Sequence, residues 1–248
     1  MVDPPARGTA LVTGASSGIG AATVRALAAA GYATVAAARR LERCEEIARE
    51  VGGRALRLDV TDAESVSQLA SELDEVSVIV HSAGGAFGLD PVAETDEDEW
   101  RSMYESNVLG VVGVTKALLP ALRTSGRGHV VILGSVAGVE VYEGGAGYTA
   151  AKHAVHAVAK TLRLELLADG IRVTEVAPGL VETEFSLVRF GGDEQRAAEV
   201  YRGIESLRGE DVADVIAFVV TRAPHVDIDY VGMKPTAQAT ATVVHRRD

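Results

Sequence analysis

The chain has one cysteine, Cys44, and no run of 18 uninterrupted apolar residues. A lone cysteine excludes an intrachain disulfide framework. Without a second cysteine at metal-ligand spacing, we expect Cys44 to be an inert helix residue. The missing apolar run argues against a membrane-spanning helix. The first residues also lack a charged segment followed by an apolar one, so we expect no signal peptide and a cytoplasmic location.

Basic and aromatic residues are scarce as well. Lys and Arg number 24 against 35 Asp and Glu, a formal net charge of -11, whereas nucleic-acid-binding surfaces are basic. We therefore expect no nucleic acid or membrane partner, and no metal site. Aromatic residues make up 4% of the chain and hydrophobic residues 47%, so small aliphatic side chains must fill the core. Such side chains suit strands that helices cover on both faces.

Short apolar runs alternate with longer amphipathic segments along the whole chain. The predicted strands are Thr9–Val12, Tyr32–Ala38, Ala55–Leu58, Val76–Val80, Val130–Leu133, Arg172–Val176 and Val226–Met233. The predicted helices are Gly18–Ala30, Leu41–Val51, one from a capping box at Thr61 and Glu64 to Leu73, Asp98–Arg123 after a start signal at Thr95, Gly147–Ala168, a short one near Gln195–Ile204, and Glu210–Thr221. This alternation predicts a single-domain, doubly wound α/β sandwich with about seven parallel strands and helices on both faces. Residues 179–209 lack a clear pattern and are expected to form a mobile segment that covers a site.

A glycine-rich loop follows the first predicted strand and opens the first helix. Its glycines, spaced G-x-x-x-G-x-G, permit positive φ and a close approach of backbone to phosphate. The helix start then offers free N–H groups to a pyrophosphate. The alternative is a plain tight turn, which the position between strand and helix disfavours. The candidate cofactor contacts of this loop are Gly14, Ser16, Ser17, Gly18, Ile19 and Gly20.

The end of the second predicted strand indicates which dinucleotide binds. An NAD site carries Asp or Glu there for the ribose 2′-hydroxyl, but this strand ends in Arg39 and Arg40. Guanidinium groups suit a 2′-phosphate. We therefore predict NADP(H) as the cofactor, the alternative being that both arginines are simply solvated.

Four polar residues, together with the glycine loop, form a recognisable pattern. Tyr148 and Lys152 are four apart at a predicted helix start, Ser135 ends the fifth strand, and Asn107 lies in the helix after the fourth. With the glycine loop, in this order, the chain resembles the short-chain dehydrogenase/reductase family over nearly its whole length. The resemblance implies a Rossmann fold, a hydride transfer at an alcohol or carbonyl carbon, and Asn107, Ser135, Tyr148 and Lys152 as the catalytic residues.

The resemblance also implies further cofactor contacts, and elementary electrostatics supports the catalytic roles. The implied contacts are Asp59 and Val60 at the adenine, Ala83 and Gly84 beside the cofactor, and Pro178, Gly179, Val181 and Thr183 near the nicotinamide, with Tyr148 and Lys152 also touching it. A free tyrosine has a pKa of about 10 and is a poor base at neutral pH. The Lys152 ammonium and the nicotinamide charge would favour the phenolate, so Tyr148 would take or give the alcohol proton. Ser135 would hold the same oxygen, and Asn107 would anchor a water that links Lys152 to solvent.

One motif departs from the family pattern. The family carries Asn-Ala-Gly after the fourth strand, whereas this chain has Ser82-Ala83-Gly84. Serine is shorter and offers fewer hydrogen bonds, which puts cofactor affinity and local rigidity in question. The neighbouring His81 is interpreted as a strand-end residue rather than a catalytic base.

The run from Pro178 to Asp193 and the tail containing Pro235–Gln238 resemble the NADP-dependent 3-hydroxy acid dehydrogenases. That branch implies a small acid whose carboxylate needs a cation. The candidates are Arg189, Arg196 and Arg202, with Arg189 or Arg202 favoured and solvated surface arginines as the alternative. Glu140 and Glu143 would repel an acid or bind a substrate ammonium, and their direction stays open.

Two other functions stay open from the sequence. One is reduction of a bulkier ketone or aldehyde from secondary metabolism, and the other is a non-catalytic NADP(H)-binding regulator, which has no need of a proton donor. The family resemblance also implies a homo-oligomer, a dimer or tetramer, through the long helices Asp98–Arg123 and Gly147–Ala168.

Overall fold

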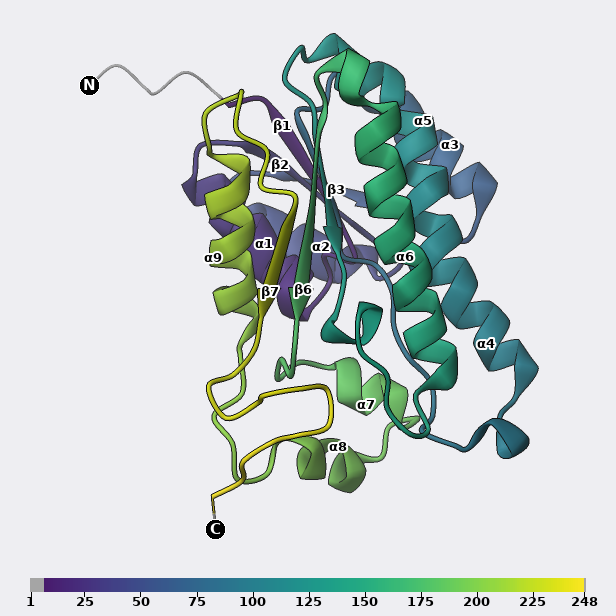
Figure 1. Ribbon diagram of the computed structural model, residues 1–248. Coiled ribbons are helices and arrows are strands. Elements are labelled where there is room, and N and C mark those ends of the chain that lie inside the picture. Colours follow the sequence, from purple (N-terminus) through teal and green to yellow (C-terminus); the bar gives the residue numbers. More distant parts are fainter. Residues whose placement is uncertain (1–6, 248) are drawn as a thin grey trace.

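Seven parallel strands form one sheet in the computed structural model, which describes residues 7–247 (Figure 1). Their order across the sheet is β3-β2-β1-β4-β5-β6-β7, and every neighbouring pair is parallel. The strands are β1 (Thr9–Thr13), β2 (Ala33–Ala38), β3 (Arg54–Arg57), β4 (Val78–His81), β5 (His129–Leu133), β6 (Arg172–Pro178) and β7 (Tyr230–Met233). The predicted doubly wound α/β fold is confirmed.

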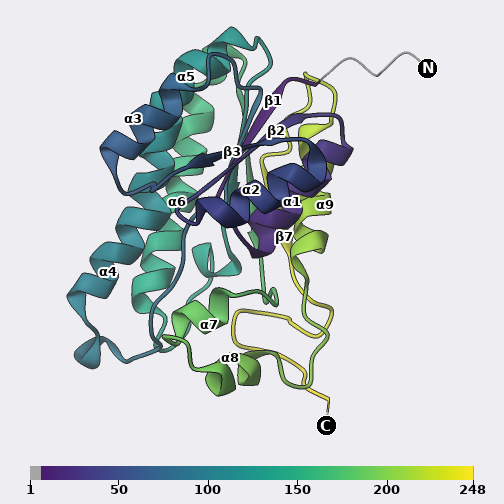
Figure 2. The same ribbon diagram turned by 180° about the vertical axis from the view of Figure 1, so that it is seen from behind.

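Helices cover both faces of this sheet, as the two opposite views show (Figure 2). One layer holds α1 (Gly18–Ala29), α2 (Leu41–Val51) and α9 (Gly209–Val220). The other holds α3 (Ala63–Ser71), α4 (Glu97–Tyr104), α5 (Gly110–Thr124) and α6 (Ala146–Glu165). Below the sheet in Figure 1 lie α7 (Phe185–Arg189) and α8 (Glu194–Tyr201). The short turns are η1 (Val92–Glu94), the π-turn η2 (Glu105–Leu109), η3 (Val136–Gly138) and η4 (Leu167–Asp169).

The alternation of side chains along each central strand fills two separate cores. In β1, Leu11 points into the core beneath α3, α5 and α6, whereas Val12 points into the core beneath α1 and α9. Ile79 and Val80 of β4 divide in the same way. Successive strand side chains face opposite sides, so a strand buried on both faces needs a continuous apolar run. This burial accounts for the aliphatic composition.

Strand order reverses between β1 and β4, and this reversal positions the site. The chain runs outward through β2 and β3 and then returns to the other side of β1 with β4. In open α/β sheets, ligands bind at such a switch point, outside the carboxyl ends of the strands. Those ends point toward α7 and α8 at the bottom of Figure 1. The glycine loop follows β1 at this edge.

The predicted strands differ from the observed ones by one or two residues at their ends, and β7 starts four residues later than predicted. β4 starts at Val78 because the backbone N–H of Val76 donates to Ala121 at the end of α5, outside the sheet. β7 starts at Tyr230 because Val226 closes a turn onto Ala223. Neither shift changes which side chains face each core.

Helix starts and continuity also differ from the sequence prediction. The predicted caps at Thr61 and Thr95 were each one residue early: Asp62 and Asp96 accept the backbone N–H two residues on. An ionised side chain is a stronger acceptor than a hydroxyl at a helix N-terminus. The predicted helix Asp98–Arg123 is α4, the π-turn η2 and α5, and α7 was not predicted.

Candidate active site

Ser135, Tyr148 and Lys152 come together at the carboxyl end of β5. Ser135 follows β5 and caps η3, where its Oγ accepts the backbone N–H of Ala137 at 3.1 Å. Tyr148 lies in the first turn of α6, and Lys152 follows one turn later on the same face. All three side chains are buried. The structure thus brings together three of the four predicted catalytic residues around one point.

The Tyr148 phenol is buried, and its surroundings act on its ionisation in both directions. Burial raises the pKa of Tyr148 above its ordinary value, while its hydrogen bond with Ser135 and the charge of Arg189 act to lower it. The Lys152 Nζ lies 5.7 Å from the centre of the Tyr148 ring, and so does the Arg189 guanidinium carbon. Sequence reasoning named Lys152 as the protein cation that favours the phenolate, and the structure adds Arg189.

Lys152 is fixed by a backbone carbonyl. Its Nζ donates to the Leu133 oxygen at 2.9 Å, at the end of β5. Burial lowers the pKa of Lys152 to about 8, and the carboxylate of Glu175 opposes that shift. The ammonium form therefore predominates at neutral pH, which is the form that the sequence-based role requires.

Asn107 lies in the π-turn η2, between α4 and α5. Its Nδ2 donates to the carbonyls of Gly85 at 2.9 Å and Met103 at 2.8 Å. Its Oδ1 is buried without a hydrogen-bond partner among the described residues. An added Cβ on Gly84 would lie 2.5 Å from that oxygen. Single π-turns within helices often occur at functional sites, and this one packs Asn107 against the predicted cofactor loop.

The glycine loop has the shape that a dinucleotide phosphate requires. Gly14 and Gly18 adopt positive φ angles of 65° and 50°. A Cβ on Gly14 would lie 2.7 Å from the Ala83 nitrogen, and one on Gly20 would lie 2.4 Å from the Gly14 oxygen. Only glycine fits these approaches. Helix α1 begins at Gly18 after Ser17, whose side chain caps no backbone group, so its first N–H groups remain free for phosphate oxygens.

Arg40 is the predicted arginine that reaches the glycine loop. Its guanidinium donates to the hydroxyls of Ser16 at 3.1 Å and Ser17 at 2.9 Å, and it pairs with Glu184 at 2.9 Å. Arg39 instead lies near Asp59. Burial acts to raise the pKa of Asp59, but hydrogen bonds from Thr61 and the nearby arginine charges outweigh it, so the pKa is lowered. Basic groups and hydroxyls that gather here fit a 2′-phosphate.

The remaining predicted contacts follow the carboxyl ends of the central strands. Ala83 and Ser82 donate their backbone N–H groups to the Thr13 hydroxyl at 3.1 and 3.2 Å, which ties the loop after β4 to β1. Thr13 therefore braces the position where the family asparagine is absent. Opposite, Gly18 faces Thr183, whose Cβ would lie 3.1 Å from an added Cβ. Pro178 ends β6, and Val181 and Ile19 pack with the core beneath α1 and α9, whereas Val60 packs against the core on the other face of the sheet.

Helix α7, which the sequence analysis did not predict, covers Tyr148. Phe185 packs on the Tyr148 ring at 5.6 Å between centroids. Arg189 donates through Nε to the Gly88 carbonyl at 2.9 Å and through Nη1 to the Tyr142 hydroxyl at 3.1 Å. Its Nη2 is buried without a partner among residues 7–247. A short apolar run, Phe185–Val188, was the only signal for this helix.

The other candidate substrate groups point elsewhere. Arg196 stacks on Phe190 at 4.5 Å, and Arg202 pairs with Glu199 on an exposed surface. Glu140 pairs with Lys234 at 3.3 Å and accepts the Ala241 backbone N–H, so it anchors the C-terminal tail. These three residues do not lie with Tyr148. Arg202 is therefore not an equal candidate to Arg189, which corrects the prediction from the sequence.

His81 and Cys44, for which the sequence indicates no catalytic role, are structural residues. His81 is buried against the Thr115 hydroxyl at 2.8 Å, and burial lowers its pKa to about 3, so it stays neutral. Burial raises the pKa of Cys44 to about 11, which leaves its thiol unreactive. Neither group lies in the set around Tyr148.

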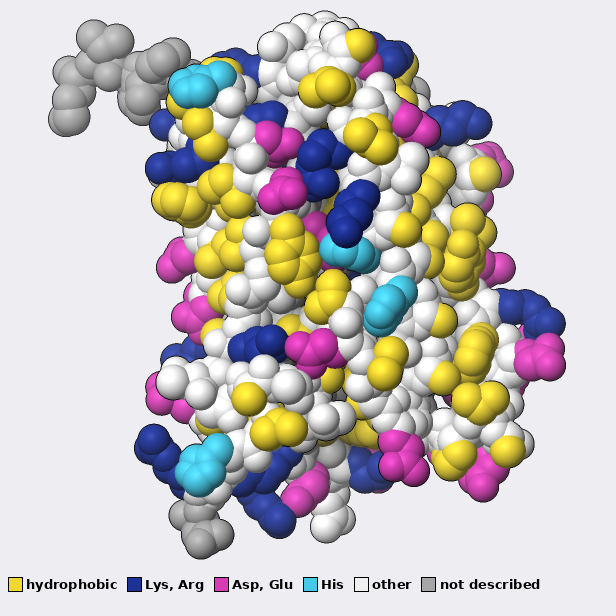
Figure 3. Space-filling view, viewed as in Figure 1, with side chains coloured by type: hydrophobic (Ala, Val, Ile, Leu, Met, Phe, Trp, Pro, Cys, Tyr) yellow, Lys and Arg dark blue, Asp and Glu magenta, His cyan; other side chains and the backbone are white. Residues whose placement is uncertain are grey.

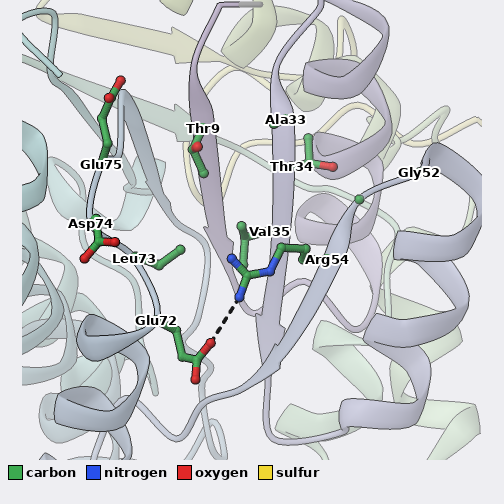
Figure 4. A pocket seen from close by; sticks show the side chains of 11 residues that line it. Thr9, Ala33, Thr34, Val35, Gly52, Arg54, Glu72, Leu73, Asp74 and Glu75 are labelled. Atoms are coloured by element: carbon green, nitrogen blue, oxygen red, sulfur yellow. Dashed lines mark hydrogen bonds and ion pairs between the residues drawn. The ribbon is translucent and has the colours of Figure 1, made fainter.

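A hollow at the opposite end of the sheet offers no comparable chemistry. It encloses about 500 Å³ beside the starts of β1, β2 and β3. An ion pair between Arg54 and Glu72 crosses it, while Asp74 and Glu75 point in different directions (Figure 4). Within residues 7–247, no group of three metal-ligating side chains gathers, and no helix has the length and apolar character to cross a bilayer.

Comparison with known proteins matches the chain to one family. The family model described as short chain dehydrogenase matches residues 8–190. An uncharacterized oxidoreductase of Mycobacterium tuberculosis is 55% identical over 233 residues, 94% of this chain and 93% of the relative. The NADP-dependent 3-hydroxy acid dehydrogenase of Schizosaccharomyces pombe is 40% identical, covering 96% of each chain.

A solved structure extends the likeness to three dimensions. The closed form of a serine dehydrogenase complexed with NADP+ superposes with a TM-score of 0.91 and 35% identity, covering 96% of this chain and all of the other. Fold and site together define an oxidoreductase that binds a nicotinamide dinucleotide. The chain belongs to the short-chain dehydrogenase/reductase family, and the predicted NADP(H)-dependent class is confirmed.

Proposed function

We propose that this enzyme oxidises the 3-hydroxyl group of a small hydroxy acid with NADP+, or reduces the matching carbonyl with NADPH. The observation that carries the proposal is the Arg189 guanidinium, which lies 5.7 Å from the Tyr148 ring with one buried nitrogen unpartnered among the described residues. An unpaired buried donor is costly unless a ligand satisfies it. A carboxylate is the acceptor that guanidinium geometry suits best.

The position of Arg189 is fixed before any substrate arrives. Its Nε and Nη1 are held by Gly88 and by Tyr142, whose ring lies 5.5 Å below the guanidinium carbon. Rigid groups lose little conformational entropy when they bind, so a preorganised cation binds its anion more tightly. Arg189 would hold the carboxylate while the hydroxyl carbon faces Tyr148.

The cofactor, when bound, supplies the hydride acceptor or donor. The residues of this chain handle the proton and the substrate oxygen. In the oxidative direction, the Tyr148 phenolate removes the proton from the substrate hydroxyl, and the Ser135 hydroxyl hydrogen-bonds the same oxygen. The Lys152 ammonium would favour the phenolate and would hold the nicotinamide ribose. Asn107 would anchor a water through which Lys152 exchanges its proton with solvent.

The cover over Tyr148 favours a small substrate over the bulkier ketone. Phe185, Tyr142 and Trp100 pack around a buried cluster that includes Tyr148. A large ketone would have to displace these rings, whereas a three- or four-carbon acid demands less room beside Tyr148. The non-catalytic regulator is disfavoured by family membership and by the intact set of catalytic residues.

The direct test is an initial-rate assay with NADP+ against L-serine, L-allo-threonine, 3-hydroxyisobutyrate and 3-hydroxypropionate. We expect turnover of at least one acid, with kcat/KM at least about 100-fold above that of its methyl ester, because the ester lacks the charge that Arg189 binds. A sulfonate analogue should retain activity, since it also carries a small anionic group. Equal rates on acid and ester, or a preference for large neutral ketones, would rule the proposal out.

Cofactor choice gives a separate expectation for Arg40. Arg40→Ala should raise the KM for NADP+ by about 10-fold or more and leave the KM for NAD+ nearly unchanged, because charge-assisted hydrogen bonds to the 2′-phosphate contribute about 1.5–3 kcal/mol. Arg39→Ala is the neighbouring comparison and should show the same selectivity with a smaller effect, since Arg39 lies by Asp59. Parallel losses for both cofactors would contradict the assignment of Arg40.

We also propose that the enzyme acts as a homo-oligomer in the cytoplasm, where NADP(H) is supplied. Exposed apolar side chains on α4, η2 and α5 support association through this helical layer: Tyr104, Leu109 and Val112. Figure 3 shows hydrophobic side chains gathered along that side of the molecule. Leu164 and Leu167, near the end of α6, are exposed as well.

A further inference from the structure

A buried carboxylate lies behind the catalytic lysine, and the mechanism above gives it no role. Glu175 is in β6, between Ile132 of β5 and Tyr230 of β7 in the strand register. Its side chain is 2% exposed. One oxygen, Oε2, accepts a hydrogen bond from His156 Nδ1 at 2.5 Å, and Oε1 has no partner among the described residues. A buried carboxylate is costly unless nearby groups stabilise its charge.

The loop that carries Ser135 is shaped around this carboxylate. A Cβ on Gly134 would lie 2.2 Å from Glu175 Oε1, and a Cβ on Gly138 would lie 3.8 Å from the same atom. Both glycines flank the catalytic serine. Lys152 reaches the same stretch of backbone, since its Nζ donates to the carbonyl of Leu133, directly before Gly134. The Lys152 ammonium and the Glu175 carboxylate therefore both lie beside the turn at residues 133–138. No hydrogen bond joins these two groups in the described part of the chain.

His156 connects this carboxylate with the surface. It follows Lys152 by four residues on α6, so both side chains project from one face of the helix. Its side chain is 20% exposed, and the edge of the Tyr230 ring packs on it at 5.8 Å between centroids. Histidine side chains reach the surface beside α6 in Figure 3. Solvent thus has access to the imidazole but not to Glu175.

We propose that Glu175, held by His156, is a positioning residue that keeps Lys152 in its ammonium form during turnover. The groups that face the carboxylate from neighbouring elements are Lys152 and His156 of α6 and Tyr230 of β7, and η3 contributes no ionisable side chain. The negative charge of Glu175 opposes the loss of a proton that burial imposes on Lys152. The proposal rests on the role given to Lys152 under the proposed function.

The test measures Lys152 directly, because the chain has only four lysines: Lys116, Lys152, Lys160 and Lys234. In protein labelled with 13Cε-lysine, the NMR shift of each lysine is followed against pH, and the Lys152→Met variant assigns the signal. We expect the isosteric Glu175→Gln to move the Lys152 titration midpoint down by about one pH unit or more. The exposed Lys160 serves as the internal control and should not move.

Two variants of His156 keep the test decisive if Glu175→Gln fails to fold. His156→Asn preserves a donor to Glu175 without a titrating ring, so its Lys152 midpoint should stay within about 0.3 pH units of the native value. His156→Leu removes the donor that holds the carboxylate in place and should lower the Lys152 midpoint as Glu175→Gln does. An unchanged Lys152 midpoint in folded Glu175→Gln or His156→Leu would overturn the proposal.

Kinetics supply the second readout. A midpoint that falls from about 8 to about 7 reduces the ammonium fraction at pH 7.5 about threefold, so kcat/KM should fall about threefold there and stay unchanged near pH 6. A structural defect would lower activity equally at both pH values. Because the NMR titration needs no substrate, its outcome is independent of whether the proposed hydroxy acid is correct.

Discussion

Tyr148→Phe is expected to lower kcat by about 10³–10⁴-fold while changing the dissociation constant of NADPH less than about threefold. The substitution removes only the phenolic oxygen, which is the proposed proton donor and acceptor, and general acid–base groups contribute rate factors of this size. The ring keeps its contact with Phe185, so the fold and the cofactor crevice remain. Single-turnover rates and NADPH fluorescence titration measure the two quantities separately.

Tyr142→Phe is the matched control for that experiment. Tyr142 lies in the same cover and also loses one hydroxyl, but that hydroxyl binds Arg189. We expect a loss of less than about tenfold in kcat, because the proton transfer itself is untouched. Similar losses in Tyr142→Phe and Tyr148→Phe, or wild-type turnover in the latter, would show that Tyr148 is not the acid/base.

The elements that local sequence dictates were predictable. The glycine loop needs positive φ angles at Gly14 and Gly18 and close approaches at Gly14 and Gly20, and glycine meets both conditions. Tyr148 and Lys152 share a helix face because they are four residues apart. Ser135 ends a strand whose apolar run is visible in the sequence. Each of these inferences depends on neighbours within one strand, helix or turn.

Features that depend on distant contacts were not predictable. Asn107, in the π-turn, donates a hydrogen bond to the carbonyl of Gly85, which only tertiary packing brings near. In the sequence, nothing distinguishes Arg189 from Arg202 as a candidate. In the structure, hydrogen bonds to Gly88 and Tyr142 fix only Arg189 over the Tyr148 ring. Glu175 lies in the largely apolar strand β6, and the sequence does not indicate that its charge is buried. Its partner His156 lies on another element, so no local pattern links the two residues.

Arg189→Met should lower kcat/KM for the acid substrate by about 10²–10³-fold, mainly through KM. Methionine keeps the length and apolar stem of the side chain but removes the charge, and a desolvated ion pair with one partner truncated loses about 2–5 kcal/mol. Initial rates over a range of acid concentrations measure this loss. Arg196→Met, on the same covering segment but stacked on Phe190, is the matched control and should stay within about threefold of the native enzyme.

The charge of Arg189 also acts on Tyr148, and pH separates the two effects. The charge of Arg189 acts to lower the pKa of Tyr148, so its removal raises that pKa and moves the acidic limb of the oxidation profile to higher pH. That part of the loss can be recovered by raising pH, because more phenolate then forms. Loss of the carboxylate contact cannot be recovered in this way, and it should disappear when a neutral alcohol replaces the acid. If high pH restored the full activity of Arg189→Met on the acid, Arg189 would act only on the ionisation of Tyr148. It would then have no role in binding the substrate.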